Sequence, residues 1–322
     1  MIIQNNTNKQ YIEFITRLCT YSPCICSNIM SLGKMLTNGT THTNTSNHFP
    51  KRIILVRHGE CLANADINVY GTTPNHKIEL TQKGIEQAKQ TGSLIKKLIT
   101  SENAVESNNW KVFFYVSPAE RTRRTLREMG QSFPKRKLMG VKEEYRLREL
   151  SFGNYHNPAS IAKVKEERVK YGRFYYRVPG GETGAEVYDR ISSFVECLRR
   201  DIEMKKFCDD TSQDTNIIIV THGLSSRIFL MKWFEWTIEQ FEDLNRMKTC
   251  EFQVLQLGQR GEYSLAFHHN DKKLREWGLS LDMIEDQKRR AYGPIVNSLE
   301  LCDLYPYMDC FAEDSDEENT II

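Results

Sequence analysis

We predict from the amino-acid sequence a three-layer α/β/α sandwich with a mostly parallel central sheet. Three short apolar runs, 52–56, 112–116 and 216–220, are continuous and end in polar loops, as in strands buried on both faces. Longer segments with a helical spacing of apolar residues alternate with these runs. Strands that alternate with helices are typical of α/β domains with parallel strands.

The elements follow in order along the chain. Thr81 is a suitable N-cap residue for a helix whose apolar positions are Ile85, Ala88, Gly92, Ile95 and Ile99. A second helix, 119–130, is predicted directly after the strand at 112–116. The segment 186–204 predicts a long amphipathic helix with an apolar face of Val187, Ile191, Phe194, Val195 and Leu198. The alternating segments 250–258 and 263–269 predict a closing pair of strands.

The composition limits the classes of function. The chain has 322 residues with 44 basic and 42 acidic side chains, and this balance argues against a dedicated nucleic-acid-binding protein. No apolar run approaches the roughly 18 residues that span a membrane, so we expect no membrane partner. The nine cysteines are odd in number and form no regular framework, which predicts free thiols in a reducing compartment such as the cytoplasm.

We predict three parts: an N-terminal segment at 1–50, a catalytic domain at 51–278 and a C-terminal extension with an acidic tail at 279–322. The first segment is rich in Asn, Ser and Thr, and Glu13 is its single acidic residue. It is either a disordered extension or a transit peptide for a chloroplast or mitochondrion. Its three cysteines have no second cluster at ligand spacing, so we expect no metal site there.

Polar residues follow each of the three buried runs. The first is followed by Arg57, His58, Gly59 and, six residues past the histidine, Asn64; the second by Ser117 and Arg121; the third by Thr221, His222 and Gly223. Ligands of open α/β sheets bind beyond the carboxyl ends of the strands. If the strands are parallel neighbours, two histidines, two arginines and an asparagine converge at one edge.

These residue types suit phosphoryl transfer. Arg57 and Arg121 offer forked pairs of N–H donors to phosphate oxygens. His58, with an ordinary pKa near about 6.5, supplies a neutral nucleophile at neutral pH. His222, as a cation or as a donor, would stabilise charge on the phosphoryl oxygens. The glycine after each histidine lacks a Cβ, so we expect the backbone there to approach the ligand closely.

Five motifs occur in an order that resembles the histidine phosphatase superfamily, which includes the cofactor-dependent phosphoglycerate mutases. They are LVRHGE (55–60) with Asn64, SPAERTRRT (117–125), LRELSFG (147–153), PGGET (179–183) and VTHG (220–223). The chain is especially similar to the plant phosphoglycerate mutase-like proteins, over roughly residues 51–278. The resemblance implies the phosphoglycerate mutase-like fold.

The resemblance also implies a phosphohistidine intermediate on His58 and a phosphate pocket of Arg57, Asn64, Arg121 and His222, which Gly223 adjoins. It places the proton donor at Glu149, with Glu143 and Glu144 close by in the chain. It implies chemistry without a metal or other cofactor, because the arginines and His222 stabilise the charge.

The sequence departs from the family pattern at two places. Cys61 stands where the family commonly has serine, a position of support. The segment between Gly153 and Pro179 is shorter than in true mutases, whose insertion holds the carboxylate of phosphoglycerate. Its basic, aromatic stretch is either an ordinary surface helix or a grip on an anionic substrate through Lys170, Arg173 or Arg177.

The function that we predict is a phosphatase acting on a small phosphorylated metabolite, in carbohydrate metabolism. The first alternative is a phosphoglycerate mutase-type phosphotransferase, against which the short segment counts. The second alternative is a non-catalytic protein that binds a phosphorylated ligand on the same fold. A nucleophile together with a candidate proton donor counts against that, because binding alone requires neither.

Overall fold

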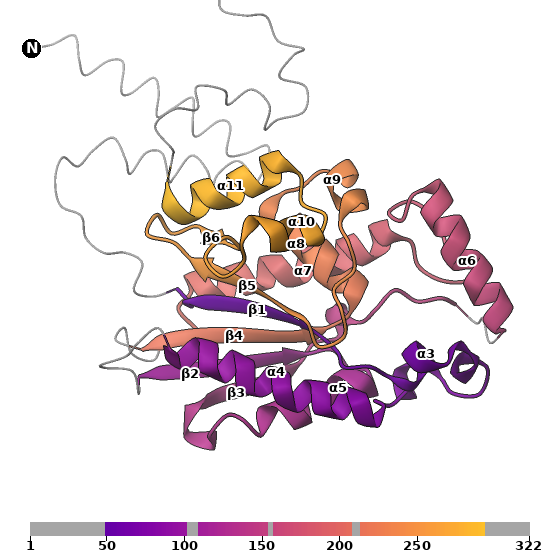
Figure 1. Cartoon of the computed structure of the whole chain (residues 1–322), viewed down its shortest axis with the longest axis horizontal. Helices are drawn as coiled ribbons and strands as arrows, with labels where there is room; N and C mark the ends of the chain where they lie inside the picture. The colour runs from indigo at the N-terminus through magenta and orange to yellow at the C-terminus, as the bar shows by residue number, and fades with distance from the viewer. Residues whose placement is uncertain (1–48, 102–108, 154–156, 208–212, 294–322) are drawn as a thin grey trace, which may run out of the picture. The chain divides into compact units, whose positions relative to one another are not determined.

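A six-stranded mixed sheet forms the centre of the protein, in the order β3-β2-β4-β1-β5-β6 (Figure 1). Its strands are β1 (Arg52–Arg57), β2 (Trp110–Val116), β3 (Leu138–Glu143), β4 (Asp214–Thr221), β5 (Phe252–Leu257) and β6 (Tyr263–Ser264). The four strands β3, β2, β4 and β1 are parallel, whereas β5 and β6 are antiparallel to their neighbours. The computed structural model describes residues 49–101, 109–153, 157–207 and 213–293. Residues 1–48 of the predicted N-terminal segment and the acidic tail lie outside these ranges.

The carboxyl ends of β1, β2 and β4 lie side by side. Arg57 pairs with Thr221 in the parallel register of β1 and β4, and Val116 pairs with Val220 in that of β2 and β4. The backbone pairing continues one residue further, where the N–H of His58 donates to the carbonyl of Thr221 at 3.0 Å. The three polar segments that follow these strands therefore converge at one edge of the sheet, as the sequence predicts.

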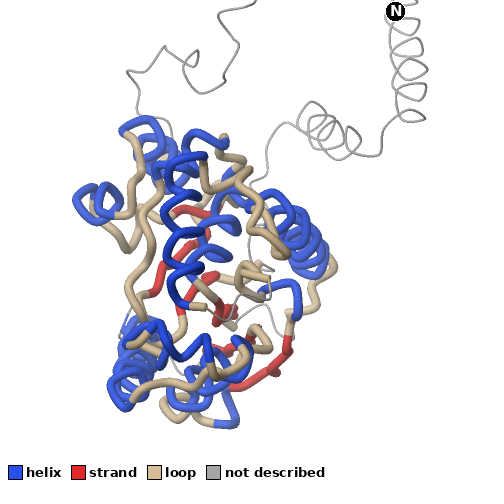
Figure 2. The backbone as a smooth tube through the Cα atoms, turned by 90° about the vertical axis from the view of Figure 1, so that its right-hand side faces the viewer, coloured by secondary structure: helices blue, strands red, loops and turns tan. Residues whose placement is uncertain are grey.

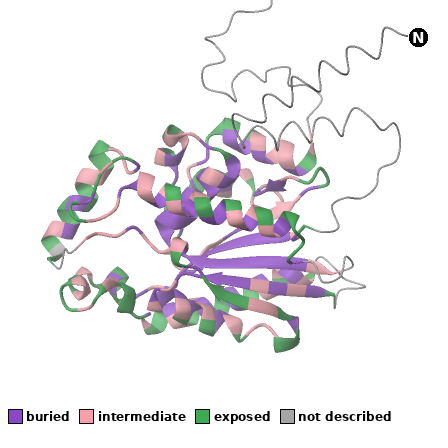
Figure 3. Ribbon diagram, turned by 180° about the vertical axis from the view of Figure 1, so that it is seen from behind, coloured by how far each residue is buried: buried purple, intermediate pink, exposed green. Residues whose placement is uncertain are grey.

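Helices cover both faces of the sheet and complete the predicted three layers (Figures 1 and 2). On one face lie α4 (Gln82–Ser101) and α5 (Glu120–Gly130); on the other lie α7 (Gly184–Glu203) and α8 (Gly223–Phe234). Alternate residues of β1 point to opposite faces. Ile54 and Val56 pack in the core beneath α4 and α5, and Ile53 and Leu55 pack in the core beneath α7 and α8. Every residue of β1 is buried, so the continuous apolar run reflects burial on both sides (Figure 3).

The remaining helices lie around this frame. They are α3 (Leu62–Ala65), η2 (Ile67–Gly71), η3 (Asn75–Lys77), η4 (Lys135–Lys137), η5 (Tyr145–Leu147), α6 (Pro158–Tyr171), α9 (Ile238–Asp243), α10 (Asp271–Glu276) and α11 (Leu281–Tyr292). Within the predicted C-terminal extension, α11 packs Met283 and Ile284 into the core. No helix in the described ranges is both long enough and apolar enough to cross a membrane.

The predicted strand at 263–269 is wrong beyond Ser264. Past that residue the backbone turns, and the ring of His269 accepts the N–H of Val254 at 3.0 Å, where a longer strand would supply a carbonyl. The edge strand β3 was not predicted. Its residues are half-buried or exposed, so it lacks the continuous apolar run of the three central strands.

Candidate active site

A cavity of about 160 Å³ opens at the edge of the sheet where β1, β2 and β4 end. Its walls come from elements that are far apart in the sequence. They include His58 after β1, Asn64 on α3, Arg121 in the first turn of α5, and Glu149 in the loop after η5. The structure thus brings the predicted nucleophile, one phosphate-binding arginine, the asparagine and the proton donor to one cavity. Arg57 and His222 lie buried beside His58.

His58 is held in the tautomer of a nucleophile. Its Nδ1 lies 2.7 Å from the carbonyl oxygen of Gly59. A carbonyl only accepts hydrogen bonds, so Nδ1 carries the proton and Nε2 keeps its lone pair. Burial lowers the pKa of His58 well below its ordinary value, and the charge of Arg121 lowers it further. The imidazole is therefore neutral at neutral pH.

His222 lies against His58, with ring centroids 5.3 Å apart. The side chain is fully buried and its Nε2 is 2.7 Å from the hydroxyl oxygen of Ser117. Burial, and then the charge of Arg121, lowers the pKa of His222 well below its ordinary value. Of the two roles that the sequence allows, the structure supports the neutral donor. If Ser117 donates to Nε2, the proton of His222 is on Nδ1, which has no hydrogen-bond partner in the described residues.

The two predicted arginines each have N–H donors that make no hydrogen bond within the described residues. Arg57 donates from Nη1 to the carbonyl of Met247 at 2.5 Å, and its buried Nε has no partner among the residues described. Arg121 donates from Nη1 to the carbonyl and the side-chain oxygen of Asn75, at 2.7 and 3.1 Å. Burial, and then repulsion by Arg246, lowers the pKa of Arg57 to about 10, so it stays charged at neutral pH. Both guanidinium groups retain the charge and the donors that an anion requires.

Glu149 is fixed by backbone amides. Its carboxylate accepts from the N–H groups of Leu150 at 3.1 Å and of Leu224, in the first turn of α8, at 3.3 Å. Burial raises the pKa of Glu149, but the charge of Arg246, these two hydrogen bonds and the charge of Arg121 together outweigh burial and hold the pKa below its ordinary value. Before a ligand binds, the side chain is therefore a carboxylate.

The two neighbouring acids that the sequence left open are engaged elsewhere. Glu143, on β3, forms an ion pair of 2.7 Å with Arg123 on an exposed surface. Glu144, which is buried, forms an ion pair of 2.8 Å with the half-buried Arg146. Neither lines the cavity, whereas Glu149 does.

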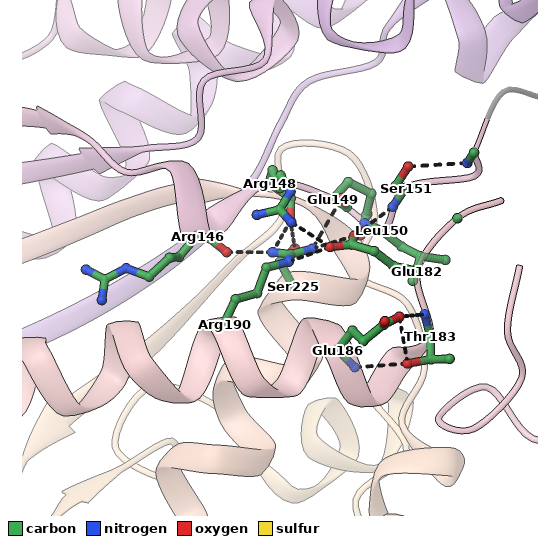
Figure 4. A network of polar contacts seen from close by, with 12 residues as sticks. Arg146, Arg148, Glu149, Leu150, Ser151, Glu182, Thr183, Glu186, Arg190 and Ser225 are labelled. Atoms are coloured by element: carbon green, nitrogen blue, oxygen red, sulfur yellow. Dashed lines mark hydrogen bonds and ion pairs between the residues drawn. The ribbon is translucent and has the colours of Figure 1, made fainter.

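Arg190, on α7, holds the loop that carries Glu149 (Figure 4). Its guanidinium donates to three carbonyls of this loop, those of Arg146 at 2.5 Å, Arg148 at 2.7 Å and Glu149 at 3.3 Å. Glu182 pairs with Arg190 at 3.1 Å and with Arg148 at 2.6 Å. No pattern in the sequence indicated Arg190, whereas Glu182 lies in the PGGET motif.

Cys61 supports the asparagine of the cavity. The side-chain oxygen of Asn64 accepts from the backbone N–H of Cys61 at 3.1 Å and lies 3.2 Å from its sulfur. This oxygen is thereby occupied, and the amide nitrogen of Asn64 has no hydrogen bond within the described part of the chain. The buried thiol of Cys61 thus orients Asn64, in line with the supporting role expected at this position.

Gly59 and Gly223, the glycines that follow the two histidines, lie close to other parts of the protein. A Cβ on Gly59 would lie 2.6 Å from the carbonyl oxygen of Gly84, and a Cβ on Gly223 would lie 2.8 Å from Nε of Arg246. The approach of their backbone to a ligand stays a prediction. The missing side chains make room for α4 and for Arg246, and neither glycine lines the cavity.

The basic residues that the sequence suggested for substrate binding do not line the cavity. Arg173 donates to the carbonyl of Glu242 at 2.7 Å, Arg177 pairs with Glu186 at 2.9 Å, and Lys170 is exposed. The cavity is instead lined by Lys165 and Arg168 of the same segment, and by Arg227 and Arg246. The buried Ile161 and Val164 mark the inner face of α6, and the helical phase places residues 165 and 168 beside it.

Comparisons with known proteins agree with this geometry. The family model of the histidine phosphatase superfamily (branch 1) matches residues 53–270. The phosphoglycerate mutase-like protein AT74H of Arabidopsis thaliana is 47% identical over 279 residues, covering 85% of this chain and 99% of that protein. The broad-range acid phosphatase DET1 of Saccharomyces cerevisiae is 30% identical, and the match covers 67% of this chain and 88% of that protein. The solved structure of mycobacterial hydrolase 1 has the same fold, with a TM-score of 0.50 at 20% identity, covering 64% of this chain and 89% of that one.

Proposed function

Because the chain belongs to the histidine phosphatase superfamily, we propose that it is a metal-independent phosphatase acting on a small phosphorylated metabolite through a phosphohistidine on His58. One observation carries the proposal. The hydrogen bond from Nδ1 of His58 to the carbonyl of Gly59 leaves Nε2 as a neutral nucleophile, beside arginine donors that have no protein partner in the described residues.

The reaction proceeds in two steps. Nε2 of His58 attacks phosphorus, the bond from phosphorus to the ester oxygen breaks, and Glu149 gives a proton to that oxygen. Water then attacks the phosphorus of the phosphohistidine and Glu149 takes a proton from that water. The bond from phosphorus to Nε2 of His58 breaks, and phosphate leaves. Arg57, Arg121 and the donor of His222 stabilise the charge on the phosphoryl oxygens in both steps.

Glu149 must gain a proton before the first step, because it is a carboxylate in the unliganded protein. A phosphate ester has its second pKa near about 6, so its monoanion brings a proton into the cavity. The negative charge of the bound phosphoryl group also raises the pKa of the adjacent carboxyl. This route favours mildly acidic conditions. The similarity to a protein named an acid phosphatase supports it.

A phosphoglycerate mutase-type transfer is the second candidate, and the similarity to a phosphoglycerate mutase-like protein favours it. In that reaction a hydroxyl of the substrate, in place of water, takes the phosphoryl group. The short segment between Gly153 and Pro179 supports the phosphatase, because less chain is available to exclude water. For the setting of the enzyme, we propose carbohydrate metabolism in the cytoplasm, or in a chloroplast or mitochondrion if residues 1–50 direct import.

The test is turnover of p-nitrophenyl phosphate with and without a metal chelator, by wild type, His58→Ala and His76→Ala. His76 is an exposed histidine on η3 and serves as the matched control. We expect turnover that the chelator leaves unchanged, its loss in His58→Ala, and its retention in His76→Ala. Acid-labile phosphate should be trapped on the wild type and should be absent from His58→Ala. Acid-labile phosphate on His58→Ala would disprove the covalent assignment, and absence of any turnover by wild type would favour a binding protein.

A further inference from the structure

The cavity holds more positive charge than one phosphoryl group requires. Arg57 and Arg121 lie beside His58 and suit the transferred group, whose charge is at most about −2. Four further cations line the cavity: Lys165, Arg168, Arg227 and Arg246. The carboxylate among the described lining residues is Glu149. With the phosphoryl group bound, the cavity therefore keeps a surplus of about three positive charges.

None of these four cations forms an ion pair within the described residues, although the charge of Glu149 acts on Arg168, Arg227 and Arg246 from a greater distance. No carboxylate in the described ranges lies within ion-pair distance of any of them, whereas Arg146, Arg148 and Arg190 nearby are all paired. Surface cations often lack a partner, but this cluster spans three separate elements: α6, α8 and the loop after α9. Like charges that converge from distant parts of a chain repel one another, so the arrangement raises the free energy of the unliganded protein.

Two of the four lie partly or wholly below the surface, and one of them, Arg168, is incompletely bonded there. Arg168 donates from Nη2 to the carbonyl of Arg173 at 2.7 Å, but its buried Nε has no partner among the residues described. Arg227 is 8% exposed and donates from Nη1 to the carbonyl of Leu244 at 2.9 Å and from Nε to the carbonyl of Gly223 at 3.4 Å. Burial, and then repulsion by Arg173, lowers the pKa of Arg227 to about 10, so it stays charged at neutral pH. A buried, charged donor without a partner is costly, and an anionic ligand would supply the partner.

A second, smaller cavity of about 100 Å³ adjoins the first. The two share Tyr70, Asn75, Phe152 and Lys165. Apart from Lys165, the described residues of the smaller cavity are uncharged, and Ile161 and Phe152 are apolar. The space beside Lys165 thus suits the carbon skeleton of a small metabolite.

We propose that Lys165, Arg168, Arg227 and Arg246 form a second anion subsite. The preferred substrate is then a small phosphate ester with a second anionic group, a phosphate or a carboxylate, on the same skeleton. This proposal rests on the phosphatase function for its kinetic consequences. It assigns the substrate class from the unpaired charge of the cavity.

Matched pairs of esters test it on the full-length protein. Glycerol 3-phosphate and 3-phosphoglycerate differ in a carboxylate; fructose 6-phosphate and fructose 1,6-bisphosphate differ in a phosphate. The variants are Lys165→Gln and Arg246→Gln, both at exposed positions where folding is least at risk, with Lys170→Gln on the same helix as the control. The readout is the ratio of kcat/KM within each pair.

We expect the wild type to prefer the bis-anionic member of at least one pair, and that pair identifies the second group. Lys165→Gln and Arg246→Gln should each reduce this preference by about 10- to 100-fold, the effect of losing one hydrogen bond to a charged group. Lys170→Gln should keep it. Equal rates within both pairs for wild type, or an unchanged preference in both variants, would overturn the subsite.

Measurements of ligand binding distinguish an error in the proposed subsite from an error in the proposed phosphatase function. If the wild type hydrolyses no ester, including p-nitrophenyl phosphate, calorimetry with 3-phosphoglycerate and glycerol 3-phosphate still reports on the subsite. Tighter binding of 3-phosphoglycerate that Lys165→Gln weakens by about tenfold supports the subsite without catalysis. Equal affinity for the two ligands would refute it.

Discussion

Arg190 donates a hydrogen bond of 3.3 Å to the backbone carbonyl of Glu149, so a helix on one face of the sheet holds the loop of the proposed proton donor (Figure 4). The same guanidinium also bonds the carbonyls of Arg146 and Arg148. A neutral side chain cannot replace three charge-assisted bonds. The position of the Glu149 carboxylate therefore depends on a residue that does not line the cavity.

We predict that Arg190→Gln slows hydrolysis of an alkyl phosphate by about 10- to 100-fold, as expected when a general acid is displaced. Hydrolysis of p-nitrophenyl phosphate should slow much less, because nitrophenolate leaves without a proton. Arg190→Lys, which keeps the charge but not the fork, should be intermediate. Arg200→Gln is the control, since Arg200 is exposed on the same helix and bonds only the sulfur of Cys197 within the described residues. Equal losses on both esters would indicate a general loss of structure.

The second prediction separates the acid from the phosphate clamp. Glu149→Gln should slow an alkyl phosphate strongly and p-nitrophenyl phosphate less, with a burst of nitrophenol where hydrolysis of the phosphohistidine becomes limiting. Arg121→Lys should slow both esters comparably, by about 2–4 kcal/mol, because we propose that Arg121 contacts the transferred group itself. Burst and steady-state kinetics on both esters distinguish the roles. An equal effect of Glu149→Gln on both, with no burst, would move the acid role to another residue.

The third prediction concerns the pH dependence of stability. His58 and His222 are buried, and their folded-state pKa values lie well below the ordinary 6.5 of the unfolded chain. Below that pH the unfolded chain binds more protons than the folded one, so the free energy of unfolding falls as pH falls. Each histidine contributes a slope approaching about 1.4 kcal/mol per pH unit between pH 6.5 and its folded pKa. Urea denaturation between pH 7.5 and 5.5 measures the slope, which His222→Asn should reduce. A flat profile would contradict buried neutral histidines.

The fourth prediction tests the contact between α4 and the segment after β1. A Cβ on Gly84 would lie 2.0 Å from the carbonyl oxygen of Glu60, and backbone cannot yield without moving the helix. We expect Gly84→Ala to lower the free energy of unfolding by about 1–3 kcal/mol and to reduce activity, because the displaced segment follows His58. Gly130→Ala on α5 meets nothing within 4 Å and should be neutral or stabilising by up to about 1 kcal/mol. Similar denaturation midpoints for the two variants would refute the contact.

The sequence by itself determined the features that depend on neighbours in the chain. Continuous apolar runs arise wherever a strand is buried on both faces, and so β1, β2 and β4 were predicted within a few residues of their observed ends. The chemistry at their carboxyl ends followed, because parallel neighbours bring the next residues together. His58, Arg121 and Glu149 were named on this basis and from the family motifs, and all three line the cavity.

Tertiary structure decided what depends on long-range placement. The strand β3 has no apolar run because it lies at the edge of the sheet, and its pairing with β2 defines it. Arg190 reaches Glu149 only because α7 packs beneath the loop, a distance that no local pattern encodes. The orientation of α6 about its axis places Lys165 and Arg168, and not Lys170, at the wall of the cavity. The path of the chain after α9 places Arg246 against Gly223. The residues that we propose determine substrate specificity thus come from distant elements. They line one cavity because the fold places them close together in space, which their spacing in the sequence does not reveal.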